Sequence, residues 1–330
     1  MLLVLVGVVG IVGPVYDTAA GSIEPIELAR RPSVVGPISA RGLVVVAYGN
    51  PSAISIAAYD ANAHLRWKRD LPGGSFSGEL QACEDLVYAP AFQDGVYVFG
   101  ARDGRLKAHL LPRLADPTPL VVCTPERVCM RAFHGRAATV VAFETKRFRK
   151  VWQVEFPDQR ISELTTRGTA IAVAVAEGIP ELPHGNKLVT LRANDGRRLS
   201  ARANPELPLE YGWDWLPPRA RAQLSRLFVR REANETHYLE HTPIVRLKQL
   251  VAVGRGHYAD AMLFCIRADT GRIVWQRDAP GLVSIVRVSD RLVALYAVPD
   301  MAYPDSAKRL DWLDFRTGRL LRSVRLGNAP

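Results

Sequence analysis

The feature that most constrains the fold is the stretch 262–278, which reads MLFCIRADTGRIVWQRD. Two apolar runs, MLFCI and RIVW, flank a polar Ala-Asp-Thr-Gly turn. This pattern predicts two antiparallel strands joined by a tight turn, with Gly271 free to adopt a positive φ. Trp275 follows this glycine on the second strand. A single hairpin of this kind is only marginally stable in water, so it must pack against neighbours.

The same hairpin recurs along the chain. We call the residue at the position of Gly271 the turn anchor; the anchors are residues 63, 104, 148, 196, 271 and 318, with separations of 41, 44, 48, 75 and 47 residues. Two copies replace the anchor glycine, by Ala63 and Phe148, but keep the tryptophan. The glycines and tryptophans that mark the repeat are Trp67, Gly104, Trp152, Gly196, Gly271, Trp275 and Gly318. A period in the forties is typical of propeller blades with four strands.

The sequence therefore predicts an all-β protein, a single β-propeller of four-stranded antiparallel blades over residues 33–330. Six blades are favoured, because six copies of the hairpin are present. Seven blades are the alternative, since the long separation between the fourth and fifth anchors leaves room for an insertion or a degenerate unit at 204–242. Alternating apolar residues with many β-branched side chains suit half-buried strands throughout.

The repeats resemble those of the pyrroloquinoline-quinone (PQQ)-type propeller family, whose consensus is apolar-x-Ala-apolar-Asp-x-x-Thr-Gly-x-apolar-x-Trp. The copies at the last two anchors match best, through Asp269-Thr270-Gly271 and Arg316-Thr317-Gly318. The resemblance covers residues 33–330 as repeats rather than as one aligned domain. It implies a fold more than a function, because the family includes quinoprotein dehydrogenases, outer-membrane assembly lipoproteins and propellers with no known activity.

The chain resembles the non-enzymatic, outer-membrane-assembly type more than the dehydrogenases. The dehydrogenases are much longer, and they use a catalytic Asp, a Ca²⁺ site and often a disulfide between adjacent cysteines beside the cofactor. No two cysteines are adjacent in this chain. We therefore predict no catalytic residue and no cofactor, PQQ and Ca²⁺ included. The blade tryptophans are expected to pack between blades, and Asp60 and Asp269 to form turns.

The N-terminal segment is apolar. Residues 1–16 carry no charge, and the run 2–12 is long enough for the apolar part of a signal peptide but short for a membrane span. We expect residues 1–20 to be a signal peptide or signal anchor, and residues 21–32 a linker or a ring-closing strand. A buried apolar strand is the alternative, because the first basic residue is Arg30. The favoured localisation is periplasmic or otherwise extracytoplasmic, with the N-terminal segment as the membrane contact.

The four cysteines leave two alternatives open. Cys123 and Cys129 lie in two strand-like runs on either side of a Thr-Pro-Glu-Arg turn. A hairpin could bring them together as a disulfide in an oxidising compartment, or both could be buried thiols. Cys83 and Cys265 are expected to be core residues. No Cys-x-x-Cys is present, which argues against a zinc ribbon or redox dithiol.

The insertion at 204–242 is the main candidate for a functional site. It contains LPLEYGWDWLPP, with Tyr211, Trp213 and Trp215 close together, followed by Arg219 and Arg221. Aromatic and arginine side chains are common at the centres of protein interfaces, and loops on a rigid scaffold often carry function. The same aromatics could instead pack on the ring. Residues 217–241 could form an amphipathic helix or a hairpin.

A second motif in the insertion is His-x-x-Glu-His, formed by His237, Glu240 and His241. On a helix, the two histidines would face one side and could hold Zn²⁺. Because the motif precedes Pro243 in an all-β chain, surface histidines are the simpler interpretation, and these residues are only weak metal candidates.

The net charge of +10 limits the kinds of partner. Arginines are spread over all the repeats and form no Lys/Arg run interleaved with aromatics, so nucleic-acid binding is not expected. A basic surface favours an acidic partner. The sequence therefore predicts an exported, non-enzymatic scaffold that binds a protein partner through one face and the insertion. The alternative is a propeller that binds a quinone or another small ligand, with enzymatic activity, at its central funnel.

Overall fold

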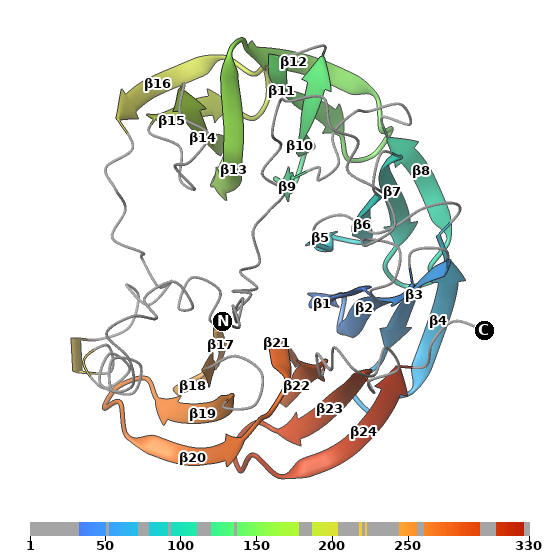
Figure 1. Cartoon of the computed structure of the whole chain (residues 1–330), viewed down its shortest axis with the longest axis vertical. Coiled ribbons are helices and arrows are strands. Elements are labelled where there is room, and N and C mark those ends of the chain that lie inside the picture. The colour runs from blue at the N-terminus through green and yellow to red at the C-terminus, as the bar shows by residue number, and fades with distance from the viewer. Residues whose placement is uncertain are drawn as a thin grey trace, which may run out of the picture.

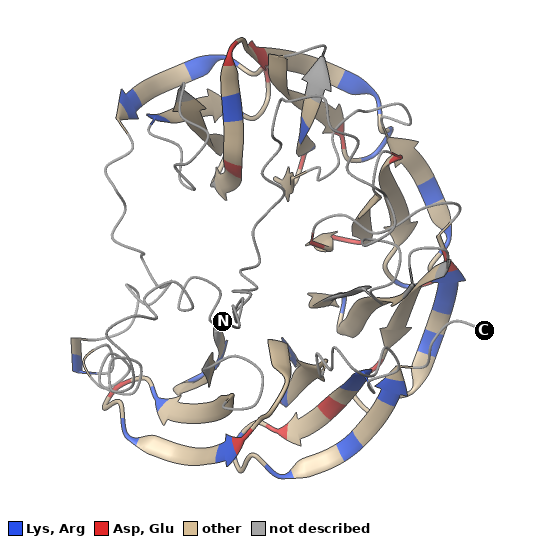
Figure 2. Ribbon diagram, viewed as in Figure 1, with Lys and Arg blue, Asp and Glu red and all other residues tan. Residues whose placement is uncertain are grey.

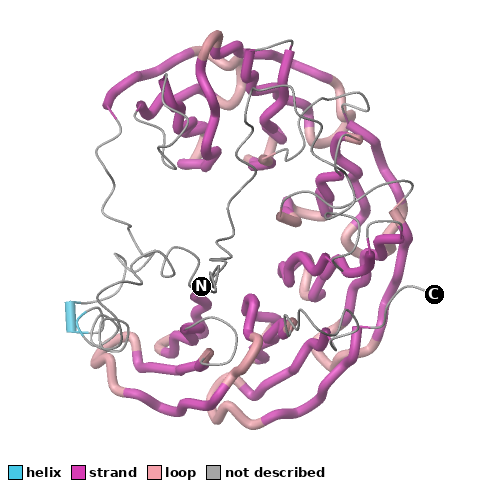
Figure 3. The backbone as a smooth tube through the Cα atoms, in the orientation of Figure 1, coloured by secondary structure: helices cyan, strands magenta, loops and turns pink. Residues whose placement is uncertain are grey.

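A computed structural model gives the fold. It describes residues 33–50, 53–71, 79–91, 94–110, 120–134, 137–177, 187–203, 244–255, 261–297 and 308–326, together with 218, 219 and 222. The regular structure in these ranges is β-strand, except that Pro218, Arg219 and Ala222 are helical (Figure 3).

The described strands form six antiparallel sheets of four consecutive strands. Blade 1 contains β1 (Ser33–Ala40), β2 (Leu43–Asn50), β3 (Ala53–Tyr59) and β4 (Leu65–Asp70). Blade 2 contains β5 (Gln81–Cys83), β6 (Leu86–Ala91), β7 (Gly95–Gly100) and β8 (Leu106–Leu110). Blade 3 contains β9 (Val121–Cys123), β10 (Arg127–His134), β11 (Ala137–Glu144) and β12 (Lys150–Phe156). Blade 4 contains β13 (Gln159–Arg167), β14 (Ala170–Glu177), β15 (Lys187–Arg192) and β16 (Arg198–Ala203). Blade 5 contains β17 (Ile244–Leu247), β18 (Leu250–Arg255), β19 (Met262–Arg267) and β20 (Ile273–Asp278). Blade 6 contains β21 (Leu282–Val288), β22 (Arg291–Tyr296), β23 (Lys308–Asp314) and β24 (Leu320–Leu326).

The sheets are arranged around a central axis as the blades of a propeller (Figure 1). In each blade the first strand lies nearest the axis and the fourth lies at the perimeter. The prediction of an all-β propeller with four-stranded antiparallel blades is therefore confirmed, with six such blades among the described residues.

The ring has two faces with different connections. On one side, which we call the turn face, lie the tight turns between the first and second strands and between the third and fourth strands. Arg41 forms an ion pair with Asp85 of the next blade there, and Arg291 forms one with Asp314 at 3.5 Å. The opposite side, the loop face, carries the second-to-third connections and the connections between blades. All internal residues outside the described ranges belong to connections that start and end on the loop face.

The last blade packs against the first, where the two ends of the ring meet. Tyr48 and Tyr59 of blade 1 share an apolar cluster with Leu295 and Trp312 of blade 6. The rings of Tyr59 and Trp312 meet edge to face, with centroids 5.8 Å apart. Among the described residues, blade 6 is built from β21–β24 alone, and the predicted ring-closing strand at 21–32 lies outside them.

The described blades do not surround the axis completely. Between blade 4 and blade 5, Figure 1 shows no described blade, and the chain there runs through 204–243, of which only Pro218, Arg219 and Ala222 are described. A seventh blade would have to come from this segment, so that alternative lies outside the described residues.

All six turn anchors have left-handed backbone conformations. The φ angles are 63° at both Gly104 and Ala63, 55° at Phe148, and 68–73° at the three remaining glycines. Because all six residues adopt the same conformation, the repeat aligned from the sequence is also a repeat in three dimensions.

The blade tryptophans link neighbouring blades. The Trp67 indole of blade 1 lies against Gly104 of blade 2, and its Nε1 donates a hydrogen bond to the carbonyl oxygen of Ala101 at 2.8 Å. A Cβ added at Gly104 would lie 2.6 Å from Cδ2 of this indole, so only glycine fits. The other two contacts of this kind join Trp152 to Gly196 and Trp275 to Gly318.

The exceptions at Ala63 and Phe148 have a physical reason. Each of these turns lies against the outermost strand of a neighbouring blade. In that strand, the position four residues after the anchor, where Trp67, Trp152 and Trp275 stand in other blades, is not a tryptophan. Arg322 stands there opposite Ala63 and donates a hydrogen bond to the Asn62 carbonyl oxygen at 3.2 Å, and Ala108 stands there opposite Phe148. Where no indole covers the turn, a Cβ at the anchor finds space despite the left-handed backbone.

The cysteine pairing differs from the sequence expectation. Cys123 is bonded to Cys83 of the neighbouring blade, and Cys129 is a buried free thiol. In the β9–β10 hairpin Cys123 is opposite Val128, and Cys129 is opposite Val122. Side chains alternate between the faces of a strand, so Cys123 and Cys129 point to opposite faces and cannot bond. Of the two alternatives for this pair, the Cys123–Cys129 bond is wrong, and the pair of buried thiols is right for Cys129 alone. Cys83 and Cys265 are buried core residues as predicted, and Cys83 is in addition the disulfide partner that the sequence did not indicate.

Candidate functional site

The predicted insertion starts at the end of β16 and stops at the start of β17, so both of its ends lie on the loop face. Arg219 is exposed and helical, but the rest of 217–241 apart from Pro218 and Ala222 lies outside the described residues, so both the helix and the hairpin remain predictions. The remaining predicted site residues of the insertion lie outside the described residues; these are Tyr211, Trp213, Trp215, Arg221, His237, Glu240 and His241. Within the described ranges, no group of three His, Cys, Asp or Glu side chains is placed to hold a metal ion.

A polar cluster borders the loop face of blade 2. The Tyr97 hydroxyl donates a short hydrogen bond to the Asp94 carboxylate, and the His109 ring contacts the Asp94 carbonyl oxygen through Nε2. The rings of His109 and Tyr97 stack, with centroids 4.1 Å apart. Burial and the Asp94 carboxylate raise the pKa of Tyr97, so its hydroxyl stays protonated and continues to donate. The cluster holds Asp94 next to the start of β7, and we assign it no reactive role.

Lys308 is a buried amine at the loop-face end of β23. Its residue is only 6% exposed, and Nζ has no hydrogen-bond partner in the described structure. Burial lowers the pKa of Lys308 to about 8, because an ammonium is poorly solvated there. Its side chain lies on the face of β23 that packs against blade 1, where Leu310 and Trp312 also lie, so we assign it no reactive role.

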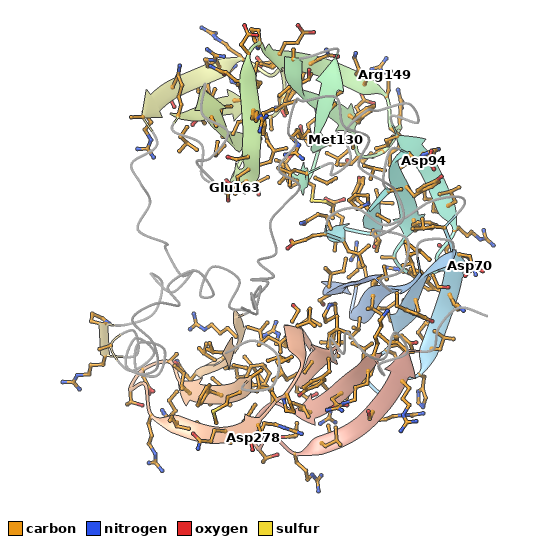
Figure 4. The ribbon with its side chains drawn as sticks, viewed as in Figure 1. Asp70, Asp94, Met130, Arg149, Glu163 and Asp278 are labelled. Carbon is orange, nitrogen blue, oxygen red and sulfur yellow. A yellow bond between two sulfur atoms is a disulfide. The ribbon has the colours of Figure 1, made fainter. Side chains whose placement is uncertain are left out.

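The turn face carries a concentration of basic residues that the sequence alone did not indicate. We define the turn belt as the six segments that extend four residues on either side of each anchor: 59–67, 100–108, 144–152, 192–200, 267–275 and 314–322. These segments contain sixteen Lys or Arg and six Asp or Glu, a net charge of +10 that equals the net charge of the whole chain. Figure 2 shows Lys and Arg on the outermost strands, and Figure 4 shows Arg149 at the perimeter.

The belt's acidic side chains accept hydrogen bonds from residues of their own turns. Glu144 accepts a hydrogen bond from Arg149 at 3.0 Å, which lowers the pKa of this carboxyl. The Arg267 guanidinium donates to Asp269 at 2.6 Å and lowers its pKa to about 2. Asp103 accepts the Arg105 backbone N–H at 3.0 Å, and its pKa is lowered as well. These carboxylates stabilise the turns, whereas all sixteen basic residues of the belt are exposed.

The belt also carries exposed apolar side chains. The structure describes eight large apolar residues that are exposed, and seven of them lie in the belt: Leu65, Leu106, Val151, Leu199, Val274, Leu320 and Leu321. Every blade contributes at least one of these residues. Each of them lies two or three positions after the anchor of its blade. The sequence contained this signal, because a basic residue follows five of the six anchors directly and His64 follows the sixth. In the linear sequence these basic residues are spread over all the repeats, and only alignment of the turns shows that they share one position.

Among the described residues, no helix is long and apolar enough to cross a membrane. No protein-family model matches the chain, and no curated protein matches it. Similar solved structures have low identity. BamB from Moraxella catarrhalis is 14% identical, with 86% of this chain and 74% of that chain covered and a TM-score of 0.35. The quinohemoprotein alcohol dehydrogenase ADHIIG from Pseudomonas putida HK5 is 10% identical, with 88% and 60% covered and a TM-score of 0.38.

The computationally designed protein Ika8 is 11% identical, with 90% of this chain and 88% of that chain covered and a TM-score of 0.37. At these identities and TM-scores the neighbours transfer neither a function nor a site. The propeller fold rests instead on the sheet topology, the aligned turns and the contacts between blades.

Proposed function

We propose that this protein is a non-enzymatic, exported propeller scaffold that binds a protein partner through its loop face and the 204–242 insertion. The observation that carries the proposal is the difference between the two faces. The turn face is built from tight turns, and its third-to-fourth turns all share the left-handed anchor, whereas the loop face bears connections of unequal length. Loops that vary in length on a rigid scaffold are where binding specificity is commonly found.

Two further observations support this proposal. The Cys83–Cys123 disulfide joins two blades and is typical of proteins from oxidising, extracytoplasmic compartments. The insertion combines aromatic residues with arginines, the composition of interface hot spots. The argument for an acidic partner, however, rested on the net charge, and that charge belongs to the turn belt. We therefore expect recognition at the loop face to depend mainly on aromatic contacts.

The test is cross-linking in the native host with a photoreactive side chain placed at position 213 or 215. A matched control places it at position 272 on the turn face. We expect one specific adduct from the insertion positions, and its loss when Tyr211, Trp213 and Trp215 are all replaced by alanine. Unchanged partner recovery after deletion of 207–240 would contradict the proposal. A saturable absorbance change on adding PQQ and Ca²⁺ would favour the small-ligand alternative.

A further inference from the structure

We propose that the turn belt is a docking surface for an anionic lipid bilayer, on which the propeller lies with its turn face down. All blades have the same strand order, so their third-to-fourth turns lie on one face at the perimeter (Figure 1). The belt is therefore a ring of similar contacts in one plane. A planar ring of this kind is complementary to an extended flat surface.

The charge of the belt fits such a surface. Its six carboxylates cancel six of its sixteen positive charges, which leaves a net charge of +10 on the belt. Arg147, Arg272 and Arg319 are exposed, and their guanidinium groups make no hydrogen bond or ion pair within the described part of the chain. Basic groups close to an anionic leaflet each contribute about 1 kcal/mol of attraction.

The apolar side chains favour a bilayer over other polyanions. Leu65, Leu106 and Leu320 are 54%, 51% and 47% exposed, and each lies close to exposed arginines. Peripheral membrane surfaces combine apolar side chains, which enter the boundary between headgroups and acyl chains, with cations that contact phosphates. Nucleic acid would use the cations but not isolated leucines. An acidic protein would need one contiguous patch, whereas these side chains come from separate blades.

The experiment measures binding of the full chain to vesicles by flotation. One set contains phosphatidylcholine alone, and the other contains about 30% phosphatidylglycerol. Any contribution of the apolar N-terminal segment is common to both sets. We expect binding to the anionic vesicles to exceed binding to the neutral ones, and the difference to fall steeply as salt is raised. Equal binding to both sets overturns the proposal, and so does no binding to either.

Two triple variants separate the belt from overall charge. The belt variant is Arg147→Glu, Arg272→Glu and Arg319→Glu. The matched control is Arg160→Glu, Arg202→Glu and Arg325→Glu, which gives the same net charge through exposed arginines outside the belt. We expect the belt variant to bind anionic vesicles at least about 100-fold more weakly, and the control to lose less than about tenfold. Equal losses overturn the assignment to the belt.

A third variant tests the apolar contact: Leu65→Ser, Leu106→Ser and Leu320→Ser. All three side chains are exposed, so folding should be unaffected, which circular dichroism and gel filtration can verify. We expect binding to anionic vesicles to weaken at least about tenfold, with unchanged retention on immobilised heparin, which reports charge alone. Wild-type vesicle binding by this variant overturns the bilayer as the occupant. Binding of an acidic protein that depends on the belt, together with no binding to vesicles, would also overturn the bilayer as the occupant.

Discussion

The contact between Trp67 and Gly104 predicts how a single methyl group should destabilise the ring. In Gly104→Ala the new Cβ would lie 2.6 Å from Cδ2 of the indole, at a residue with a φ of 63°. Gly168 provides a matched control, because its φ is 62° and a Cβ there would meet no atom within 4 Å. The two substitutions therefore share the left-handed backbone and differ in the steric contact.

The expected magnitudes follow from that difference. A left-handed conformation costs an alanine about 1 kcal/mol, so Gly168→Ala should lower the free energy of unfolding by about that amount. Overpacking adds about 1–3 kcal/mol, so Gly104→Ala should lower it by about 2–4 kcal/mol. In a Trp67→Leu background, the cost of Gly104→Ala should fall to about 1 kcal/mol, because the indole is gone.

The assay is equilibrium urea denaturation followed by far-ultraviolet circular dichroism, which does not depend on tryptophan emission. Equal destabilisation by Gly104→Ala and Gly168→Ala would refute the steric argument. So would an unchanged cost of Gly104→Ala after Trp67 is replaced. Either result would mean that the anchor glycine is required for its backbone conformation alone.

Three other predictions concern cysteine and lysine side chains. Replacing Cys83 and Cys123 by serine should lower the free energy of unfolding by about 4 kcal/mol in denaturation under oxidising conditions, because the bond closes a loop with a sequence separation of 40; wild-type stability would contradict the pairing. Cys129 and Cys265 have pKa values raised to about 12 by burial, so iodoacetamide at pH 8 should label neither thiol until the protein unfolds, as mass spectrometry can show. Lys308→Met should raise the free energy of unfolding by about 3 kcal/mol at pH 7, since the folded-state pKa of Lys308 is lowered from 10.5 to about 8. Between these two pH values the unfolded chain binds more protons, so wild-type stability should rise with pH and the advantage of the variant should shrink; a pH-independent difference would contradict the assignment.

The fold could be predicted because each blade repeats one local solution. The anchor and the tryptophan lie within one short hairpin, and the hairpin recurs with a period mostly in the forties. Both features can be found in the sequence, and they correctly indicated radial four-stranded blades. Replacement of the glycine at Ala63 and Phe148 could not be explained in the same way. The explanation depends on which side chain the adjacent blade places over the turn, and the contact between the first and last blades arises from the circular arrangement of the sheets.

The disulfide shows a different limit. Cys123 and Cys129 are close in sequence, but the register of their hairpin places them on opposite faces of the sheet. Cys83 is 40 residues from Cys123 in sequence and is its bonding partner, because innermost strands of adjacent blades lie side by side. The turn belt was missed for a similar reason: its charges form a common surface only once the six turns are placed on one face. The insertion departs from the repeat, so the repeat supplied no template for it.

The direction of the strands has a practical consequence for handling the molecule. β1 starts at Ser33 and β24 finishes at Leu326, and both points are on the loop face. An affinity handle attached directly after Leu326 would therefore start on the side opposite the belt. Protein immobilised through its C-terminal end should present the arginine-rich side to the solution, whereas ligands of the opposite side would be hindered by the support.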